Sequence, residues 1–290
     1  MKINLEKIKK EKPLKDLLEF SVINLDKPSG PTSFQVAEMV GRIIGAKKFS
    51  HFGTLDPKVT GVLPVAINRA CRLSTWFMKK NKTYVGIMRL HQDTSEEKLK
   101  EEMKKFVGKI MQMPPVKSRV KREIREREVY GWDILEKDGK EVLFVTEVEA
   151  GTYIRKLCDD LGKTIGGCHM LELRRTKAGI FSENDENFVN LYQVEEAVEE
   201  WKKGNEEKLR KMLIPGEVIS EIMPVVQVKE KFLNKLWNGS PIFKEFLSEE
   251  MNENQGNVAV FSAEKFIGVY KIAKEGNTVA KPEFVLRCGL

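Results

Sequence analysis

Residues 51–61 read HFGTLDPKVTG, a loop between two apolar segments that carries two glycines, a proline, a histidine and one carboxylate. Holding such a loop in one conformation costs conformational freedom, and proteins usually display their catalytic groups on loops of this kind. Asp56 is therefore the candidate catalytic group. An Asp before a Pro is also a routine turn former, so the loop alone leaves both interpretations open. Its glycines do not have the spacing of a phosphate-binding P-loop.

The segments around this loop alternate between strand and helix patterns. Upstream, the apolar stretch 22–25 predicts a strand, and a helix follows that is capped by Thr32 or Ser33 and closed by Gly45. The acidic segment 183–215 also reads as helical. Periodicity predicts further strands at 62–66, 82–88, 142–148 and 171–176, and further helices from 95 to 108 and from 152 to 165.

The pattern changes after Pro215. From there to the C-terminus, short strand-like pieces are separated by turns, which indicates a small β-rich domain. We therefore expect two domains, one spanning residues 1–215 and a second spanning residues 216–290.

Composition indicates a folded protein, and its mild positive charge favours a polyanionic partner such as nucleic acid or an anionic membrane surface. The 290 residues include 50 Lys and Arg against 43 Asp and Glu, a net charge of +7, with 41% hydrophobic residues. No run of 18 apolar residues and no secretory signal pattern is present, and the four cysteines are scattered, so we expect a cytoplasmic location. Cys158, Cys168 and His169 could be imagined as zinc ligands, but no second close pair completes the set, so we expect no metal.

The positive charge is concentrated in one segment. Residues 117–127, which follow Pro114 and Pro115, hold six basic and two acidic side chains. Such a segment is either an RNA-binding loop or a solvated charged hairpin.

Five motifs follow one another in a fixed order along the chain. They are NLDKPSGPTS at 24–33, GTLDP at 53–57 with GVLP at 61–64, KTYV at 82–85, GTYIRKL at 151–157 and LRRT at 173–176. In order and approximate spacing they resemble the TruB family of pseudouridine synthases, most closely its archaeal and eukaryotic dyskerin branch. The similarity covers most of residues 20–215, and the tail from residue 217 resembles, more weakly, the PUA domain of that family.

The resemblance implies roles for individual residues. Asp56 matches the catalytic aspartate that helps to detach uracil from its ribose, Tyr84 the tyrosine that stacks on the flipped base, and Arg155 the arginine that pairs with the aspartate. Taken singly, Tyr84 is an ordinary strand aromatic and Arg155 an ordinary solvated side chain. The joint match reverses these interpretations.

The resemblance also implies where RNA binds. The segment 117–127 resembles the thumb loop that holds substrate RNA, and His51 matches a histidine near the extruded base. Lys27 lies in the motif that supports the active-site loop. The candidate substrate- and RNA-binding residues are His51, Lys27, Lys117, Arg119, Lys121, Arg122 and Arg174.

The fold implied by the family is α+β, with a mixed or antiparallel central sheet flanked by helices and a small C-terminal PUA domain. The implied reaction is the isomerisation of uridine to pseudouridine, which needs no cofactor and no metal. The base has to leave its stack, which costs a few kcal/mol.

The dyskerin branch implies guide-dependent action on rRNA or tRNA. The expected partners are a box H/ACA guide RNA, its target RNA and three small proteins: a zinc-ribbon-like protein, a β-barrel protein that controls product release, and a kink-turn-binding protein. A eukaryotic source would imply a nucleolar location.

Two alternative functions remain, a stand-alone synthase of the tRNA T-loop and a non-catalytic RNA scaffold. Phe52 departs from the small residue usual in the family and is expected to repack the loop.

Overall fold

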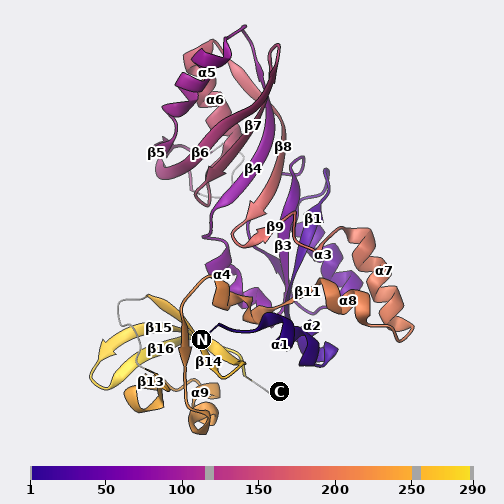
Figure 1. Ribbon diagram of the computed structural model, residues 1–290, viewed down its shortest axis with the longest axis vertical. Helices are drawn as coiled ribbons and strands as arrows, with labels where there is room; N and C mark the ends of the chain where they lie inside the picture. Colours follow the sequence, from indigo (N-terminus) through magenta and orange to yellow (C-terminus); the bar gives the residue numbers. More distant parts are fainter. Residues whose placement is uncertain (1, 115–120, 250–255, 288–290) are drawn as a thin grey trace.

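The computed structural model describes residues 2–114, 121–249 and 256–287. Within them, one large mixed sheet forms the centre of the molecule (Figure 1). Its strands are β1 (Phe20–Lys27), β2 (Phe49–His51), β3 (Thr60–Asn68), β4 (Lys82–Leu90), β5 (Gly108–Gln112), β6 (Arg125–Asp138), β7 (Glu141–Val148), β8 (Cys168–Ala178), β9 (Phe181–Ser182), β10 (Phe188–Val189) and β11 (Leu213–Pro215).

The strand order places β8 between two halves of this sheet. The order is β10-β1-β3-β8-β4-β7-β6-β5, and β2, β9 and β11 pair with its members. Strands β1 and β10, and β3 and β8, are parallel, whereas the other described pairs of this sheet are antiparallel. This confirms the expected α+β class with a mixed, mainly antiparallel central sheet. Strand β8 therefore joins the half that carries the Asp56 loop to the half that carries Tyr84.

Helices cover each half of the sheet. The described helices are α1 (Leu5–Glu11), α2 (Leu14–Glu19), α3 (Ser33–Ile44), α4 (Ser74–Phe77), α5 (Glu96–Lys104), α6 (Ile154–Ile165), α7 (Leu191–Lys202), α8 (Glu207–Met212) and α9 (Leu233–Trp237). Helices α5 and α6 lie on the half that contains β4, β6 and β7, and α3 and α7 on the half that contains β1 and β3 (Figure 1). None of the described helices is long and apolar enough to span a membrane.

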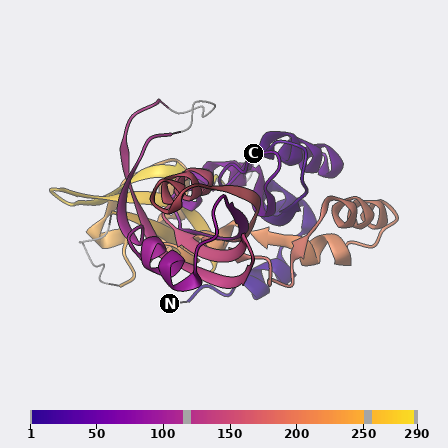
Figure 2. The same ribbon diagram turned by 90° about the horizontal axis from the view of Figure 1, so that it is seen from above.

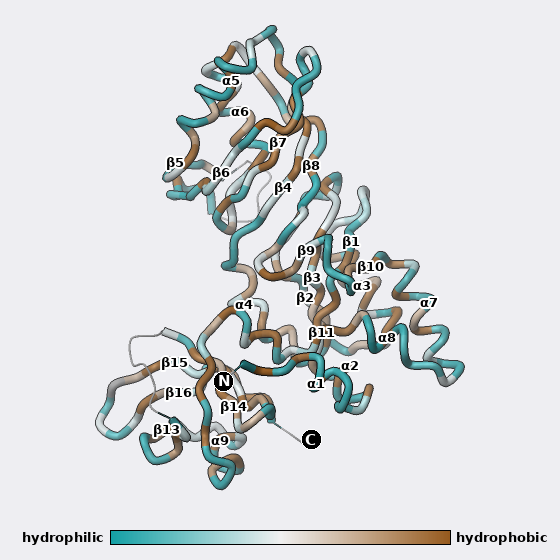
Figure 3. The backbone as a smooth tube through the Cα atoms, in the orientation of Figure 1, coloured by the Kyte–Doolittle hydropathy of each residue, from teal (hydrophilic) through white to brown (hydrophobic). Residues whose placement is uncertain are grey.

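Helix α3 shows why the motif at 24–33 folds as it does. The Thr32 hydroxyl accepts from the backbone of Gln35 while the Gln35 side chain accepts from the backbone of Thr32, a capping box that starts the helix. Gly45 ends it in the left-handed conformation. Its buried residues, among them Val36 and Val40, face the sheet. Figure 3 shows the difference in hydropathy between the apolar strands β1 and β3, which form the core, and the mainly polar helix α5.

A second sheet follows the central one. Its order is β12-β14-β15-β16-β13. Its strands are β12 (Val225–Gln227), β13 (Ile242–Phe243), β14 (Asn257–Ser262), β15 (Lys265–Glu275) and β16 (Thr278–Val285). Phe266 stacks on Phe20 of β1 with ring centroids 5.5 Å apart, so the two sheets share one apolar cluster. Helices α7 and α8 extend on the opposite side of the molecule from this sheet (Figure 2).

The N-terminal segment packs between the two sheets. Ile3 and Ile8 are buried in the shared cluster, and Arg210 of α8 donates 2.7 Å hydrogen bonds to the carbonyls of Lys9 and Lys12. The sequence pattern did not predict helices α1 and α2, because each is too short to show a full apolar stripe.

Three local predictions need correction. The segment 183–215 is only partly helical, because β10 and β11 flank helices α7 and α8. The helix that starts after Ser95 ends at Lys104, and Gly108 begins β5 instead. Strand β6 was not expected: most of its side chains are charged and partly exposed, and only Val129 and Trp132 are buried.

Candidate active site

The loop that carries Asp56 is held on both sides by hydrogen bonds. On one side, the Ser33 hydroxyl donates to the Leu55 carbonyl at 3.0 Å and accepts from the Leu55 amide at 2.8 Å. On the other side, the Gly30 amide donates to the Pro57 carbonyl at 2.9 Å. The start of α3 and the turn before it therefore fix the backbone of the loop.

Lys27, the last residue of β1, anchors the same loop from the protein interior. Its ammonium donates to the carbonyls of Pro28 at 2.8 Å, of Pro57 at 2.9 Å and of Val59 at 2.9 Å. The side chain is fully buried, so the structure places Lys27, expected among the RNA-binding residues, beneath the loop and away from the surface. Its support of the active-site loop agrees with the structure. Burial lowers the pKa of Lys27, and the nearby Asp56 carboxylate opposes that shift.

Asp56 meets Arg155 at the entrance of helix α6. Arg155 Nη2 lies 2.7 Å from Asp56 Oδ2, and both side chains are about half exposed. Tyr153 is the N-cap of α6, and the buried Gln112 holds its backbone. The side-chain amide of Gln112 accepts from the Tyr153 amide at 3.0 Å and donates to the Tyr153 carbonyl at 3.3 Å. The pair thus joins two firmly held backbones, and the Asp56 carboxylate remains partly open to solvent.

Tyr84 and His51 lie deeper than the ion pair. Tyr84 is 8% exposed and stands opposite Arg175 in the pairing of β4 with β8. The Nδ1 atom of His51 is buried and has no hydrogen-bond partner among the described residues. Burial, together with the charge of Arg175, lowers the pKa of His51, so its ring is held neutral near pH 7.

Two buried basic side chains belong to this region, and the sequence did not single them out. Arg175 is 1% exposed and Lys82 is 4% exposed. Arg175 lies in the LRRT motif and Lys82 in the KTYV motif, but a motif does not show which of its residues are buried. An arginine in a strand can face either way, and only the register shows that Arg175 faces Tyr84.

Gly61 explains how β8 comes so close to the loop. A Cβ atom at this position would lie 2.2 Å from the Arg175 carbonyl oxygen, and the backbone φ is +98°. Only glycine fits both conditions. Phe52, by contrast, points into the core: it is 1% exposed and stacks on Phe77 at 4.7 Å. Its ring therefore does not protrude into the site.

The expected RNA-binding residues are placed differently from one another. Lys117 and Arg119 lie outside the described residues, and Lys121 and Arg122 are exposed. Arg174 donates to Asp26 at 3.0 and 3.1 Å and to Glu183 at 2.7 Å. Its charge is therefore compensated within the protein, which argues against Arg174 as a free phosphate contact.

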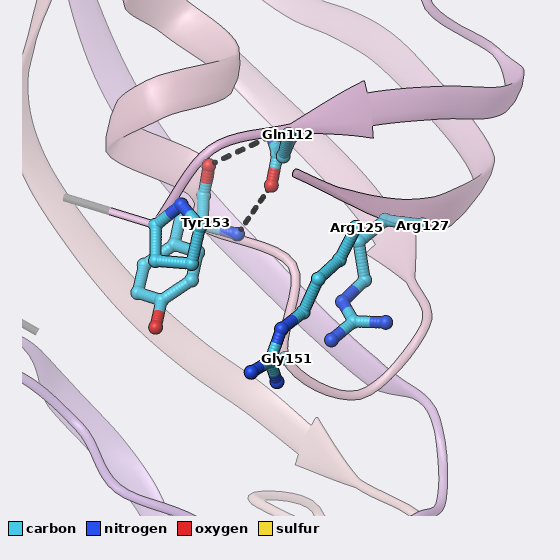
Figure 4. Close-up of a pocket in the computed structure, with 6 residues that line it drawn as sticks. Gln112, Arg125, Arg127, Gly151 and Tyr153 are labelled. Carbon is cyan, nitrogen blue, oxygen red and sulfur yellow. Dashed lines mark hydrogen bonds between the residues drawn. The ribbon is translucent and has the colours of Figure 1, made fainter. Parts of the chain in front are cut away.

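A pocket of about 180 Å³ opens beside Tyr153 and the end of the described thumb segment. Figure 4 shows the side chains of Arg125 and Arg127 side by side, across from the ring of Tyr153. Arg127 packs against Gly151, where a Cβ would lie 3.3 Å from its guanidinium. Two guanidinium groups and an aromatic ring suit a nucleotide. The pocket is lined by Gln112, Pro114, Arg125, Arg127, Gly151 and Tyr153.

The part of the chain that the structure describes contains no group of three or more His, Cys, Asp or Glu side chains placed to hold a metal ion. Cys168, weighed above as a zinc ligand, instead donates from its thiol to the Cys158 carbonyl at 2.9 Å.

Family comparisons agree with the motifs. Residues 41–154 match the model described as TruB family pseudouridylate synthase (N terminal domain), residues 155–220 match the tRNA pseudouridylate synthase B C-terminal domain, and residues 10–37 match the DKCLD (NUC011) domain. The chain is 47% identical over 232 residues to a probable tRNA pseudouridine synthase B of Methanopyrus kandleri, covering 79% of this chain and 68% of that protein. The corresponding Pyrococcus abyssi protein is 45% identical over 232 residues, with 79% and 69% coverage.

Solved structures extend the similarity to nearly the whole chain. A Cbf5-Nop10-Gar1 complex contains a chain with a TM-score of 0.87 and 37% identity, covering 96% of this chain and 88% of that one. An H/ACA RNP bound to a substrate RNA containing 2′-deoxyuridine gives a TM-score of 0.85 and 35% identity, with 96% and 88% coverage. The chain therefore belongs to the TruB family, in its dyskerin branch, and is a pseudouridine synthase, an isomerase of uridine in RNA.

Proposed function

We propose that this chain is the catalytic subunit of a box H/ACA particle and isomerises uridines that a guide RNA selects in rRNA or tRNA. The observation that carries the catalytic part is the 2.7 Å ion pair of Asp56 with Arg155 on a loop fixed by Lys27 and Ser33. The guide-dependent part rests on similarity across 96% of the chain, second sheet included, to proteins of H/ACA complexes.

In this proposal the ion pair detaches the base. Arg155 orients the Asp56 carboxylate, and the carboxylate helps to break the bond between N1 and C1′. The base then turns, C5 bonds to C1′, the C5 proton is lost and N1 gains one. Tyr84 stacks on the extruded base and is placed for the proton transfer at C5. The steps change no oxidation state.

The basic side chains near the site hold the RNA in place. Arg125 and Arg127 line the pocket beside Tyr153, and Lys121 and Arg122 are exposed next to it. Contacts from these groups to phosphates would fix the position of the strand without reading its sequence, because phosphates are the same at every nucleotide. Lys117 and Arg119 belong to the same proposed thumb.

The remaining expectations follow from the same assignment. We assign residues 1–215 to catalysis and residues 216–290 to a PUA domain that binds the guide RNA. The similar solved complexes contain Nop10 and Gar1, and we infer that this chain takes small protein partners of these kinds, with a kink-turn-binding protein on the guide. Guide-directed modification of RNA fits the cytoplasm.

A stand-alone activity on tRNA is the second candidate, because the Methanopyrus and Pyrococcus relatives carry the name tRNA pseudouridine synthase B. The purified chain is incubated with an unmodified tRNA transcript, and separately with a guide RNA, its target and the partner proteins. Pseudouridine is then mapped in each RNA. We expect modification of the guided target. Modification of tRNA alone would favour the second candidate, and modification of neither would favour a non-catalytic scaffold.

A further inference from the structure

Arg175 occupies the point where the two halves of the active site join. In the sheet, β8 places Arg175 opposite Gly61 of β3 on one side and opposite Tyr84 of β4 on the other. Side chains of directly opposed residues on neighbouring strands lie on the same face. The arginine therefore stands between the strand that follows the Asp56 loop and the strand that carries Tyr84.

Its guanidinium contacts both halves. Nε donates to the Val62 carbonyl at 2.8 Å, and Nη2 donates to the Gly53 carbonyl at 3.0 Å. Gly53 lies three residues before Asp56 in the loop. The Arg175 and Tyr84 side chains also interact with each other. One rigid, planar group thus connects the loop backbone, β3 and the base-facing tyrosine.

The burial of this cation is unusual. Arg175 is 1% exposed, and none of the ion pairs formed by the described residues includes it. The neighbouring Arg174, on the other face of β8, pairs with two carboxylates. An arginine without a carboxylate partner is expensive to bury, so packing alone gives no reason for a cation here.

The charge of Arg175 reaches the surrounding groups. Burial lowers the pKa of Lys82 to about 7, and Arg175 adds to that shift. Burial and Arg175 also lower the pKa values of His51 and Lys27. The groups beneath the site therefore respond to one central cation.

We propose that Arg175 is a positioning residue for the isomerisation, which sets the distance and orientation between Tyr84 and the loop that carries Asp56. This inference rests on the catalytic role proposed above for Tyr84. Arg175 itself acts through Tyr84 and the Gly53 carbonyl, and substrate binding by the thumb residues does not depend on it. Its loss should therefore lower kcat and leave KM for RNA nearly unchanged.

The test is a double-mutant cycle. Arg175→Gln and Tyr84→Phe are made singly and together, and single-turnover rates and KM are measured on the RNA that the wild type modifies, a guided target or a tRNA transcript. We expect Arg175→Gln to lower the rate about 10²-fold, since misplacement of a reacting group by about 1 Å costs that much. In the Tyr84→Phe background, Arg175→Gln should lower the rate less than about threefold, because the effects of substitutions at coupled residues are not additive.

Conservative and matched variants separate positioning from folding. Arg175→Lys keeps the charge and should recover part of the rate. Arg210→Gln removes an arginine that donates to two carbonyls far from the site, and we expect lower stability with unchanged kcat. If Arg175→Gln does not fold, the cycle is run with Arg175→Lys and the same criterion.

Each outcome decides between the proposals. Additive losses, or a rise in KM without a fall in kcat, would overturn the positioning role. A Tyr84→Phe enzyme with the wild-type rate would instead overturn the role of Tyr84 and, with it, this inference. An inactive wild type on both RNAs would contradict the proposed function itself.

Discussion

Arg155 and Asp56 are 99 positions apart in the chain, and yet their side chains meet at 2.7 Å. The two groups meet because the loop before β3 and the start of α6 are each fixed by buried polar side chains, Lys27 and Ser33 for the loop and Gln112 for the helix. Neither side chain of the pair is itself buried. The buried side chains that hold the two backbones therefore leave the ion pair itself accessible from solvent.

Replacing Asp56 tests the nucleophile. Asp56→Asn keeps the shape but removes the negative charge, so we expect no pseudouridine formation and nearly unchanged binding of guide RNA. Pseudouridine mapping and a binding titration measure the two effects. Asp138→Asn, at the end of β6 next to the turn into β7, is the matched control. A variant that still isomerises uridine would show that the nucleophile is misassigned.

Replacing Arg155 tests orientation of the carboxylate. Arg155→Lys keeps a positive charge but loses the planar fork that fixes the direction of Asp56. We expect about a 10²-fold lower rate under saturating RNA, in line with the cost of misplacing a reacting group. Single-turnover kinetics measure it. A rate within twofold of wild type would mean that the pair is incidental.

Removing the ammonium of Lys27 should loosen the loop. Lys27→Met leaves three carbonyls without their buried donor, and we expect a loss of about 3 kcal/mol in the free energy of unfolding. Urea denaturation measures it. Lys58→Met, an exposed lysine of the same loop, should change stability little. Equal effects of the two substitutions would contradict the anchoring role.

Lys82 should make stability depend on pH. Its pKa is lowered from 10.5 to about 7, so between these values the unfolded chain binds a proton that the folded chain has released. Stability from this group therefore rises as pH rises through that window. From pH 7 to 9, wild type should gain about 1 kcal/mol per pH unit relative to Lys82→Met, near the limit of about 1.4 for one group. If the free energies of unfolding of the two proteins change with pH in parallel, the pKa of Lys82 is not lowered.

The pocket arginines should contribute to RNA binding mainly through charge. For Arg125→Gln and Arg127→Gln, we expect weaker RNA binding. The slope of the logarithm of the binding constant against the logarithm of the salt concentration should also become smaller, by about 0.7 for each phosphate of single-stranded RNA that the variant no longer neutralises. Lys137→Gln, at the other end of β6, is the control. Binding titrations at several salt concentrations supply the slopes. Unchanged slopes would show that these groups face no phosphate.

The sequence predicted much of the local structure because its signals are local. Thr32 and Gly45 bound a helix where capping rules place its ends. A continuous apolar run indicated β3, aromatic and β-branched residues indicated β4, and alternating apolar residues indicated β7. Strand β6 was missed because its exposed, charged side chains carry no clear alternation. The short helices α1 and α2 were missed because their stability comes from tertiary packing, α1 in the cluster shared by the two sheets and α2 against the core of the central sheet.

By itself the sequence determined the family and singled out Asp56, Tyr84 and Arg155 as candidate catalytic residues, because ordered motifs record residue types and spacing. Only the tertiary structure decided what surrounds them. It buried Lys27 beneath the loop, tied Arg174 to Asp26 and turned Arg175 toward Tyr84. The reason is physical: two adjacent arginines on a strand face opposite sides, and which side becomes the active site depends on strand register, a long-range property that no short motif carries.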